Sequence, residues 1–339
     1  MSPSKANVLL VGSVPLANAS EVFSGAATHL GEHLCRFPDG ETGNRTNWVG
    51  WQLPKLAASK GLVAVVEDGA DYGTVGRVGL EETIDAVQIA NLGYRDAALA
   101  SYAEFAELKS QGVVAPDSRL QVCLPTPLAP IHLYVASQDQ AALEGIYEDA
   151  LLRELTDLIR AVPAQELAIQ WDTAIEFGVL EGVFPTYLKD PQRQIQERLV
   201  RLGEAVPANV ELGFHLCYGD AGHQHFVEPN DMRLLVDIAN AVSAGVKRSI
   251  EWIHIPVPIS RHDEAYFQPL NDLAIDSGTK LFLGLVHASD GEAGAAARIE
   301  TAKKFFTGFG IATECGLGRR PTESIPALLE LHRKLAERL

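Results

Sequence analysis

The chain is poor in basic residues and contains no long apolar run. It has 28 lysine and arginine residues against 44 aspartate and glutamate residues, which gives a net charge of -16. Such a surface repels nucleic acid and anionic lipid at long range, so neither is expected as a partner. No apolar stretch approaches the roughly 20 residues that cross a bilayer, and residues 1–7 show no signal-peptide pattern. The sequence therefore predicts a cytoplasmic protein without a membrane partner.

Cysteine is also scarce, and repeats and low-complexity tracts are absent. Four cysteines in a long chain without an export signal fit a reducing compartment, where thiols stay free for metal binding or chemistry. Cys35 and Cys123 lie in apolar stretches and are interpreted as core residues. With 47% apolar and 21% charged residues, the composition excludes disorder. A single domain over residues 1–339 is favoured, because barrels of this size form one continuous core.

Eight short apolar runs alternate with longer helical patterns. Strands that alternate with helices pair in parallel, and eight such units predict an α/β fold of the closed (β/α)8 TIM-barrel type. The predicted strands are 7–12, 34–37, 120–124, 167–172, 210–217, 249–255, 280–286 and 311–315. The predicted helices are 81–110, 140–160, 191–204, 231–244, 264–276, 291–306 and 322–338. The irregular segment 48–80, after the second strand, is expected to form an elaborated loop over the barrel mouth.

A His-x-Cys motif ends the fifth predicted strand. Alternate strand residues point the same way, so His215 and Cys217 can converge on one metal ion, and Cys315 at the end of the last strand offers a second thiol. The alternative is that all three are ordinary core residues, since free cysteine is among the most buried residue types. Polar residues at the carboxyl ends of the other strands favour a catalytic site, because those ends share one cavity.

Six short motifs, in the correct order, resemble the C-terminal catalytic barrel of cobalamin-independent methionine synthase. This barrel belongs to the superfamily that also holds uroporphyrinogen decarboxylase, and the resemblance covers nearly the whole chain. The motifs are Val11-Gly12-Ser13, Gly40-Glu41 with Arg45, Asn47 and Val49, Gln170-x-Asp172, His215-x-Cys217, Val286-His287 and Cys315-Gly316-Leu317.

The resemblance implies methyl or alkyl transfer to a small amino-acid thiol such as homocysteine, with zinc and without cobalamin. His215, Cys217 and Cys315 would be the zinc ligands, and zinc would hold the thiol as a thiolate that attacks an electrophilic carbon. His287 would protonate the leaving group, a role that suits an imidazole near neutral pH. The alternative for His287 is an ordinary hydrogen-bonded barrel histidine.

The resemblance also implies a substrate-binding set. Glu41 and Asp172 would hold the ammonium group of the thiol, and the segment 11–13 would position its carboxylate. Asp172 is placed with His287 in the catalytic set as well. Two inward carboxylates are costly without a cation, which argues for an amine-bearing acceptor. The alternatives are an ion pair between Glu41 and Arg45 and a loop cap by Asp172.

The fourth zinc ligand of the family is missing. Pro256 stands where the family has a glutamate, and Glu251 lies too far toward the closed end of the barrel to replace it. His254 shares the inward side of that strand. Zinc would then have three protein ligands, which is normal for a catalytic site.

The alkyl donor is less defined than the acceptor. The family's tryptophan after the third strand is absent from residues 125–130, so a folate donor stays uncertain. Trp48, Trp51 and Trp171 are alternative stacking residues or simple packing residues. Arg319 and Arg320 either bind a substrate anion or form an exposed basic pair. The loop residues interpreted as a lid or as solvated are His223, His225, His262 and Asp263.

Three functions stay open at this stage. A zinc-dependent thiol alkyltransferase is favoured, with a small-molecule thiol and an alkyl donor as its partners. A metal-free lyase similar to uroporphyrinogen decarboxylase is disfavoured, because that chemistry needs an arginine-rich cleft. The third is a noncatalytic zinc- or thiol-binding protein. The oligomeric state is not determined by the sequence.

Overall fold

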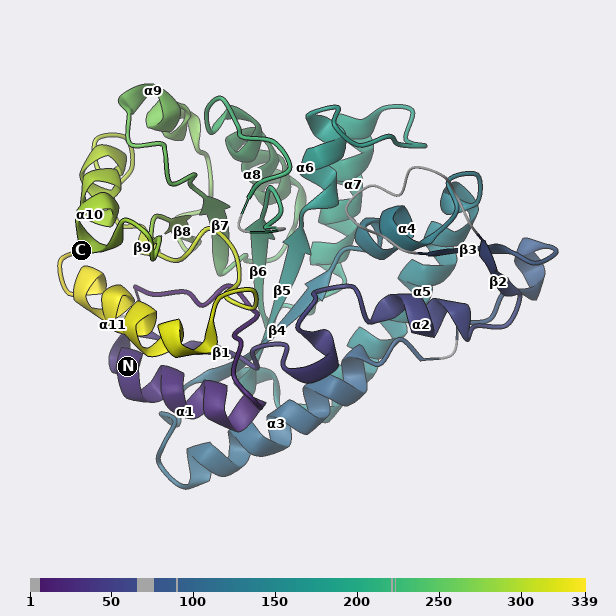
Figure 1. Cartoon of the computed structure of the whole chain (residues 1–339), viewed down its shortest axis with the longest axis horizontal. Helices are drawn as coiled ribbons and strands as arrows, with labels where there is room; N and C mark the ends of the chain where they lie inside the picture. Colours follow the sequence, from purple (N-terminus) through teal and green to yellow (C-terminus); the bar gives the residue numbers. More distant parts are fainter. Residues whose placement is uncertain (1–6, 66–75, 90, 221, 223) are drawn as a thin grey trace.

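Seven strands form one parallel sheet in the computed structural model of the chain, which describes residues 7–65, 76–89, 91–220, 222 and 224–339. The sheet curls, and helices surround it (Figure 1). Its strand order is β1-β4-β5-β6-β7-β8-β9. The bounds are β1 (Arg36–Pro38), β4 (Arg119–Pro125), β5 (Leu167–Thr173), β6 (Glu211–Leu216), β7 (Trp252–Pro256), β8 (Lys280–Gly284) and β9 (Gly310–Ile311).

The segment before α1 lies between the two ends of this sheet. Val8 forms an isolated parallel bridge with Ile311 of β9, and Ser13 forms another with Gly40, just after β1. The predicted strand 7–12 is therefore wrong as a continuous strand. Because β9 is only two residues long, it offers no extended ladder for this segment to join. The α/β class with a parallel sheet is confirmed, and closure into an eight-stranded barrel stays a prediction.

The longer helices lie outside the sheet, and α1 and α11 run side by side (Figure 1). They are α1 (Ala19–Leu30), α3 (Tyr94–Ser110), α5 (Gln140–Ala161), α7 (Pro191–Glu204), α8 (Arg233–Gly245), α10 (Gly291–Ala302) and α11 (Ile325–Ala336). The short helices are α2 (Gln52–Ala57), α4 (Leu128–Tyr134), α6 (Ile175–Leu180) and α9 (Glu264–Phe267). No helix in the described part of the chain is long and apolar enough to cross a membrane.

The helix predictions succeed where end signals are clear. α7 has the predicted bounds, because Asp190 accepts a hydrogen bond from the backbone of Arg193 and a proline opens the helix. The predicted helix 81–110 instead begins at Tyr94, since Gly93 adopts φ 89° immediately before it. The predicted helix 264–276 is a single α-helical turn followed by a 3-10 turn, Gln268–Asp272.

The described parts of the segment 48–80 are more regular than a loop. It contains α2 and an antiparallel hairpin of β2 (Leu62–Val65) and β3 (Arg77–Leu80). Residues 66–75, which belong to the predicted loop, lie outside the described residues. In Figure 1 the hairpin lies beyond α4, away from the centre of the sheet.

The inward side chains of the strands form successive layers. The innermost apolar layer is a buried cluster of Leu9, Val11, Ala168, Trp252, Phe282 and Ala312. Because side chains alternate along a strand, the next inward positions on β5 and β7 are two residues beyond Ala168 and Trp252, and the position on β6 is the one in register with β7. These positions hold Gln170, His215 and His254, which are all buried. The polar residues thus lie toward the carboxyl ends of the strands, as expected for a parallel α/β fold.

Candidate metal centre

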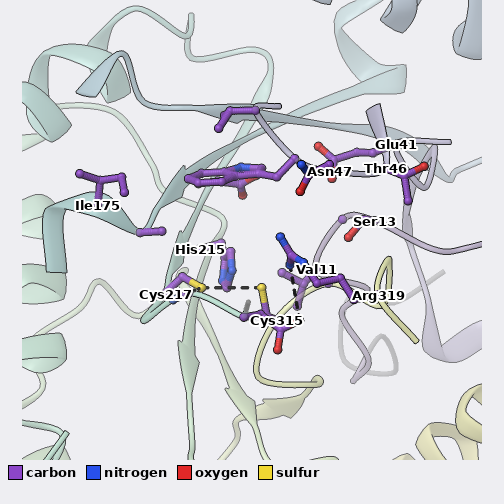
Figure 2. A pocket seen from close by; sticks show the side chains of 18 of the residues that line it. Val11, Ser13, Glu41, Thr46, Asn47, Ile175, His215, Cys217, Cys315 and Arg319 are labelled. Carbon is purple, nitrogen blue, oxygen red and sulfur yellow. Dashed lines mark hydrogen bonds and ion pairs between the residues drawn. The ribbon is translucent and has the colours of Figure 1, made fainter. Parts of the chain in front are cut away.

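The end of one strand and one distant loop bring the predicted metal ligands together. His215 lies on β6, Cys217 follows the end of that strand, and Cys315 comes four residues after β9. The candidate ligand atoms of these three residues all lie within 4.8 Å of one another. The two Sγ atoms are 3.7 Å apart, and Figure 2 shows both sulfurs beside the His215 ring. The expected convergence of the three side chains is present in the structure.

The chemistry of this cluster fits a metal ion such as zinc. His215 and Cys217 are 3% and 4% exposed, so their polar atoms are shielded from water. Nε2 of His215 is buried and has no hydrogen-bond partner, which is costly unless the atom binds something else. One imidazole nitrogen and two sulfurs form a donor set that zinc prefers. The hydrogen bond with Cys217, together with burial, holds the pKa of the metal-free Cys315 thiol well above its usual range.

A second histidine lies directly behind the first. Nδ1 of His254 is 2.7 Å from Nδ1 of His215, and Nε2 of His254 is 3.0 Å from the Thr313 carbonyl. Burial lowers the pKa of His254 to about 3. Burial and the neighbouring His254 hold the pKa of His215 well below its usual range. Both rings are therefore neutral at neutral pH, the form in which imidazole binds metals. The sequence placed His254 on the inward side of its strand but gave it no role.

No carboxylate among the described residues joins the cluster. Pro256 ends β7, at the position of the expected glutamate. Glu251 accepts a hydrogen bond from the Leu212 backbone at 2.6 Å and pairs with Arg248 at 2.9 Å. These contacts hold it beyond the opposite end of β7, in agreement with the sequence-based expectation that it is too distant to be a ligand.

Glu41 and Asp172 line the same cavity as the metal cluster. Burial, reinforced by Asp39, raises the pKa of Glu41 to about 7. Burial and the charge of Glu41 hold the pKa of Asp172 well above its usual range. Arg45 pairs with Asp39 at 2.7 Å, so the alternative pairing of Arg45 with Glu41 is not formed. Two carboxylates that repel each other in a buried site favour a cationic ligand.

Glu41 is held in an unusual backbone conformation. Its φ is 49°, which side-chain-bearing residues rarely adopt, and its backbone N–H donates to Asp39 Oδ1 at 2.9 Å. Asp172 is held differently: its Oδ1 accepts a hydrogen bond from Gln170 Nε2 at 2.8 Å. Gln170 also donates to the Val11 carbonyl at 2.6 Å. Asp172 is thus oriented from within the sheet, and Glu41 by the turn after β1.

The segment 11–13 supports the loop that carries Cys315. The Ser13 carbonyl accepts a hydrogen bond from the Leu317 backbone at 2.6 Å, and Ser13 Oγ accepts one from Gly318 at 3.2 Å. A Cβ on Gly318 would lie 2.9 Å from the Ser13 side chain, so the close approach depends on glycine. The predicted substrate segment and the Cys-Gly-Leu motif therefore form one contiguous surface of the cavity.

The cavity that these residues share has a volume of about 120 Å³. Trp48 lines it and has a positive φ of 44°. Trp51 instead packs edge-on against Tyr94, and Trp171 is fully buried with its indole N–H donating to the Leu202 carbonyl. The other lining residues include Thr46, Asn47, Leu133, Tyr134, Ile175, Asp220, Phe226 and Arg319.

His287 lies behind the loop of Cys315 and is not among the lining residues of the cavity. Its Nε2 donates to the Val257 carbonyl at 2.9 Å, and its Nδ1 is 3.6 Å from Glu314 Oε1. Burial lowers the pKa of His287 to about 4 and raises the pKa of Glu314 to about 8. His287 therefore does not border the cavity directly, and its imidazole is neutral at neutral pH.

His225, interpreted from the sequence as a lid residue or a solvated one, is not solvated. Its side chain is 4% exposed, and its Nε2 lies 3.4 Å from Glu314 Oε2. Glu314 therefore stands between His225 and His287, a grouping that no spacing in the sequence suggested. Asp263 caps α9, consistent with an exposed loop residue, while His223 lies outside the described residues.

No protein-family model and no curated protein sequence matches the chain. Solved structures share its fold. A B12-independent methionine synthase from Shewanella sp. W3-18-1, in complex with selenomethionine, superposes with a TM-score of 0.65 and 15% identity over 98% of this chain and 97% of that one. A candidate vitamin-B12-independent methionine synthase from Listeria monocytogenes gives 0.61 and 13% identity over 97% and 96%. A methyltransferase from Methanosarcina mazei gives 0.54 and 13% over 96% and 94%. At these identities the likeness establishes the fold alone.

Proposed function

We propose that this chain is a zinc-dependent transferase that moves a methyl or another alkyl group to a small amino-acid thiol. One observation carries the proposal: His215, whose buried Nε2 has no hydrogen-bond partner, places a ring nitrogen within 4.8 Å of two thiol sulfurs, and all three residues line one cavity. The shared fold with methionine synthase and methyltransferase structures supports the same reading. We also propose that the sheet closes into an eight-stranded barrel. The bridges of Val8 with Ile311 and of Ser13 with Gly40 support this closure.

His215, Cys217 and Cys315 would hold the zinc ion. When bound, zinc supplies the Lewis acidity that lowers the pKa of a thiol and favours its nucleophilic form. Three protein ligands leave one position for the substrate, as in other catalytic zinc sites. The role of the protein is to bury this cluster and to present the thiol to the donor in a water-poor cavity.

The acceptor would be a zwitterionic amino-acid thiol of the homocysteine type. Its ammonium group fits Glu41 and Asp172, because a cation relieves the repulsion between these buried carboxylates. Its carboxylate fits Arg319 and the segment 11–13, which line the same cavity (Figure 2). The thiol then extends toward the metal cluster.

His287 is proposed to assist proton transfer to the leaving group through Glu314 rather than by direct contact with the substrate, because the raised pKa of Glu314, about 8, keeps its carboxyl protonated at neutral pH. The separation of 3.6 Å between His287 Nδ1 and Glu314 Oε1 supports this arrangement. Asp172 stays in the catalytic set as the residue that orients the acceptor. The donor is an alkyl-bearing small molecule. Trp48 supplies an aromatic wall for it, whether or not the donor is a folate.

The two alternative functions fit the cavity less well than alkyl transfer does. A decarboxylase acting on a polycarboxylate needs several cationic groups, whereas Arg319 is the only arginine or lysine among the described residues that line the cavity. A noncatalytic zinc or thiol carrier uses the same metal cluster, so binding data alone do not separate it from an enzyme. Turnover separates the two.

The test combines metal analysis with turnover. Zinc per chain is measured by elemental analysis in the wild type, Cys217→Ser, Cys315→Ser and the matched control Cys35→Ser, whose thiol is free and outside the metal group. We expect zinc loss in the first two variants only. Thiol consumption is then followed with homocysteine, cysteine and glutathione against a panel of methyl donors. Full zinc occupancy in both site variants would refute the proposed metal centre, and zinc without turnover would favour the carrier.

A further inference from the structure

The two histidines that meet behind the metal cluster form a directed chain of hydrogen bonds. His254 is fully buried on β7, paired in register with His215 on β6. The Thr313 carbonyl, two residues before Cys315, lies 3.0 Å from His254 Nε2. A carbonyl oxygen only accepts, so His254 Nε2 must carry a hydrogen. The carbonyl of Thr313 therefore fixes the donor and acceptor order of these hydrogen bonds.

The positions of the hydrogens on the other imidazole nitrogens follow from this one. A neutral imidazole has one protonated nitrogen, so His254 Nδ1 is left as an acceptor. The 2.7 Å contact with His215 Nδ1 then requires a hydrogen on that atom. His215 Nε2 consequently bears the lone pair. This is the buried atom without a hydrogen-bond partner. Its ring belongs to the group whose ligand atoms lie within 4.8 Å of one another.

We propose that His254 is a positioning residue that fixes His215 as the Nδ1-protonated tautomer, with the Nε2 lone pair directed at the metal position. The inference rests on the proposed function for the identity of the ion, but not for the tautomer. A metal-binding histidine usually donates its second N–H to a carboxylate, a backbone carbonyl or water. Here a second imidazole takes that place and passes the interaction on to a backbone carbonyl.

The contact between His254 and Thr313 also links His215 to the loop that carries Cys315. Thr313 Oγ1 donates to the Cys315 carbonyl at 2.6 Å, so the residue that anchors His254 also shapes the backbone at the last thiol. The orientation of His215 and the path of the Cys315 loop therefore depend on one another through His254. Strand β7 contributes this support two residues before Pro256, the position of the missing fourth ligand.

The first experiment measures the tautomer directly. Long-range proton–nitrogen NMR of the metal-free protein, labelled with nitrogen-15 at histidine, identifies which ring nitrogen carries the hydrogen. Two internal references are present: His332, whose Nδ1 contacts the Leu328 carbonyl, and His287, whose Nε2 contacts the Val257 carbonyl. We expect His215 to match the His332 pattern and His254 the His287 pattern. An Nε2-protonated His215, or a doubly protonated His254, would overturn the inference.

The second experiment tests the consequence for zinc affinity by chelator competition. His254→Phe removes both ring nitrogens, and we expect zinc to bind roughly 10–100-fold more weakly, the usual cost of losing such a partner. His254→Asn places an amide oxygen near the Nδ1 position, where it can accept from His215, and should restore most of the affinity. Equal losses in both folded variants, checked by thermal unfolding without metal, would reduce His254 to a packing residue.

The outcomes separate this inference from the proposed function. If the wild type binds no zinc but His215 carries its hydrogen on Nδ1, the proposed function fails and the positioning role of His254 stands. If zinc binds and His215 carries its hydrogen on Nε2, the metal centre stands and the role of His254 is refuted.

Discussion

The Sγ atom of Cys217 lies 3.7 Å from the Sγ atom of Cys315, although 98 positions separate the two residues in the sequence. Both thiols border the cavity, so a small oxidant can reach them. We expect mild oxidation of the chelated protein to join them in a disulfide, and zinc to prevent it by occupying both sulfurs. Peptide mapping without reduction identifies the linked pair. Linkage to Cys123 instead, or equal oxidation with and without zinc, would contradict the proposed ligand set.

Binding of the acceptor should depend on pH through Glu41. Burial raises the pKa of this carboxyl to about 7, so it is ionised above that pH and neutral below it. Only the ionised form attracts an ammonium group. Affinity for homocysteine should therefore be constant above about pH 8 and fall by up to about tenfold per pH unit below pH 6. Calorimetry from pH 5.5 to 8.5 measures this profile.

The control for that profile is Glu41→Gln, which keeps the size of the side chain and removes its charge. We expect weaker binding with little pH dependence across the same range. A variant that retains the wild-type slope would show that another group governs the profile, and that Glu41 does not hold the amine.

Replacing His287 with alanine should slow alkyl transfer without releasing the metal. Its ring contacts Glu314 and the Val257 carbonyl and does not join the group of candidate ligands. General acid catalysis contributes about 10²–10⁴-fold to such reactions, which sets the expected loss in kcat. Elemental analysis of the same preparation gives the zinc content. Loss of zinc in His287→Ala would show that the residue supports the metal centre instead.

Gly213 on β6 has no room for a side chain. A Cβ at this position would overlap the Trp252 indole, whose N–H donates to Gln170 Oε1 at 3.1 Å. Since Gln170 also holds Asp172, Gly213→Ala should both destabilise the fold, by about 1–3 kcal/mol, and weaken acceptor binding. Thermal unfolding and calorimetry measure the two effects.

The matched control is Gly145→Ala in α5, where an added Cβ meets no other atom. Alanine has a higher helix propensity, so this variant should gain about 0.5–1 kcal/mol. Equal behaviour of the two glycine variants would show that Trp252 yields to the added methyl group and that Gly213 is not required for the site.

Local patterns predicted the regular part of the fold. The predicted helix 191–204 has end signals in its own sequence, and β5 and β8 begin at their predicted residues because apolar runs of strand length mark them. The segment 7–12 has the same pattern but forms only isolated bridges, because its pairing depends on how long a ladder β9 offers. An apolar run indicates that a segment adopts an extended conformation. Whether it forms a hydrogen-bonded ladder depends on the strands that lie beside it.

For the site, the sequence determined which residues carry the chemistry: the His-x-Cys spacing, the distant Cys315 and the two carboxylates are visible as residue types at strand ends. Only the tertiary structure decided which side chains meet. The pairing of His254 with His215 and the place of Glu314 between His225 and His287 join segments whose proximity in space no local pattern encodes. A spacing of two along one strand fixes a shared face, but contact between strands depends on register, and contact between loops depends on the path of the whole chain.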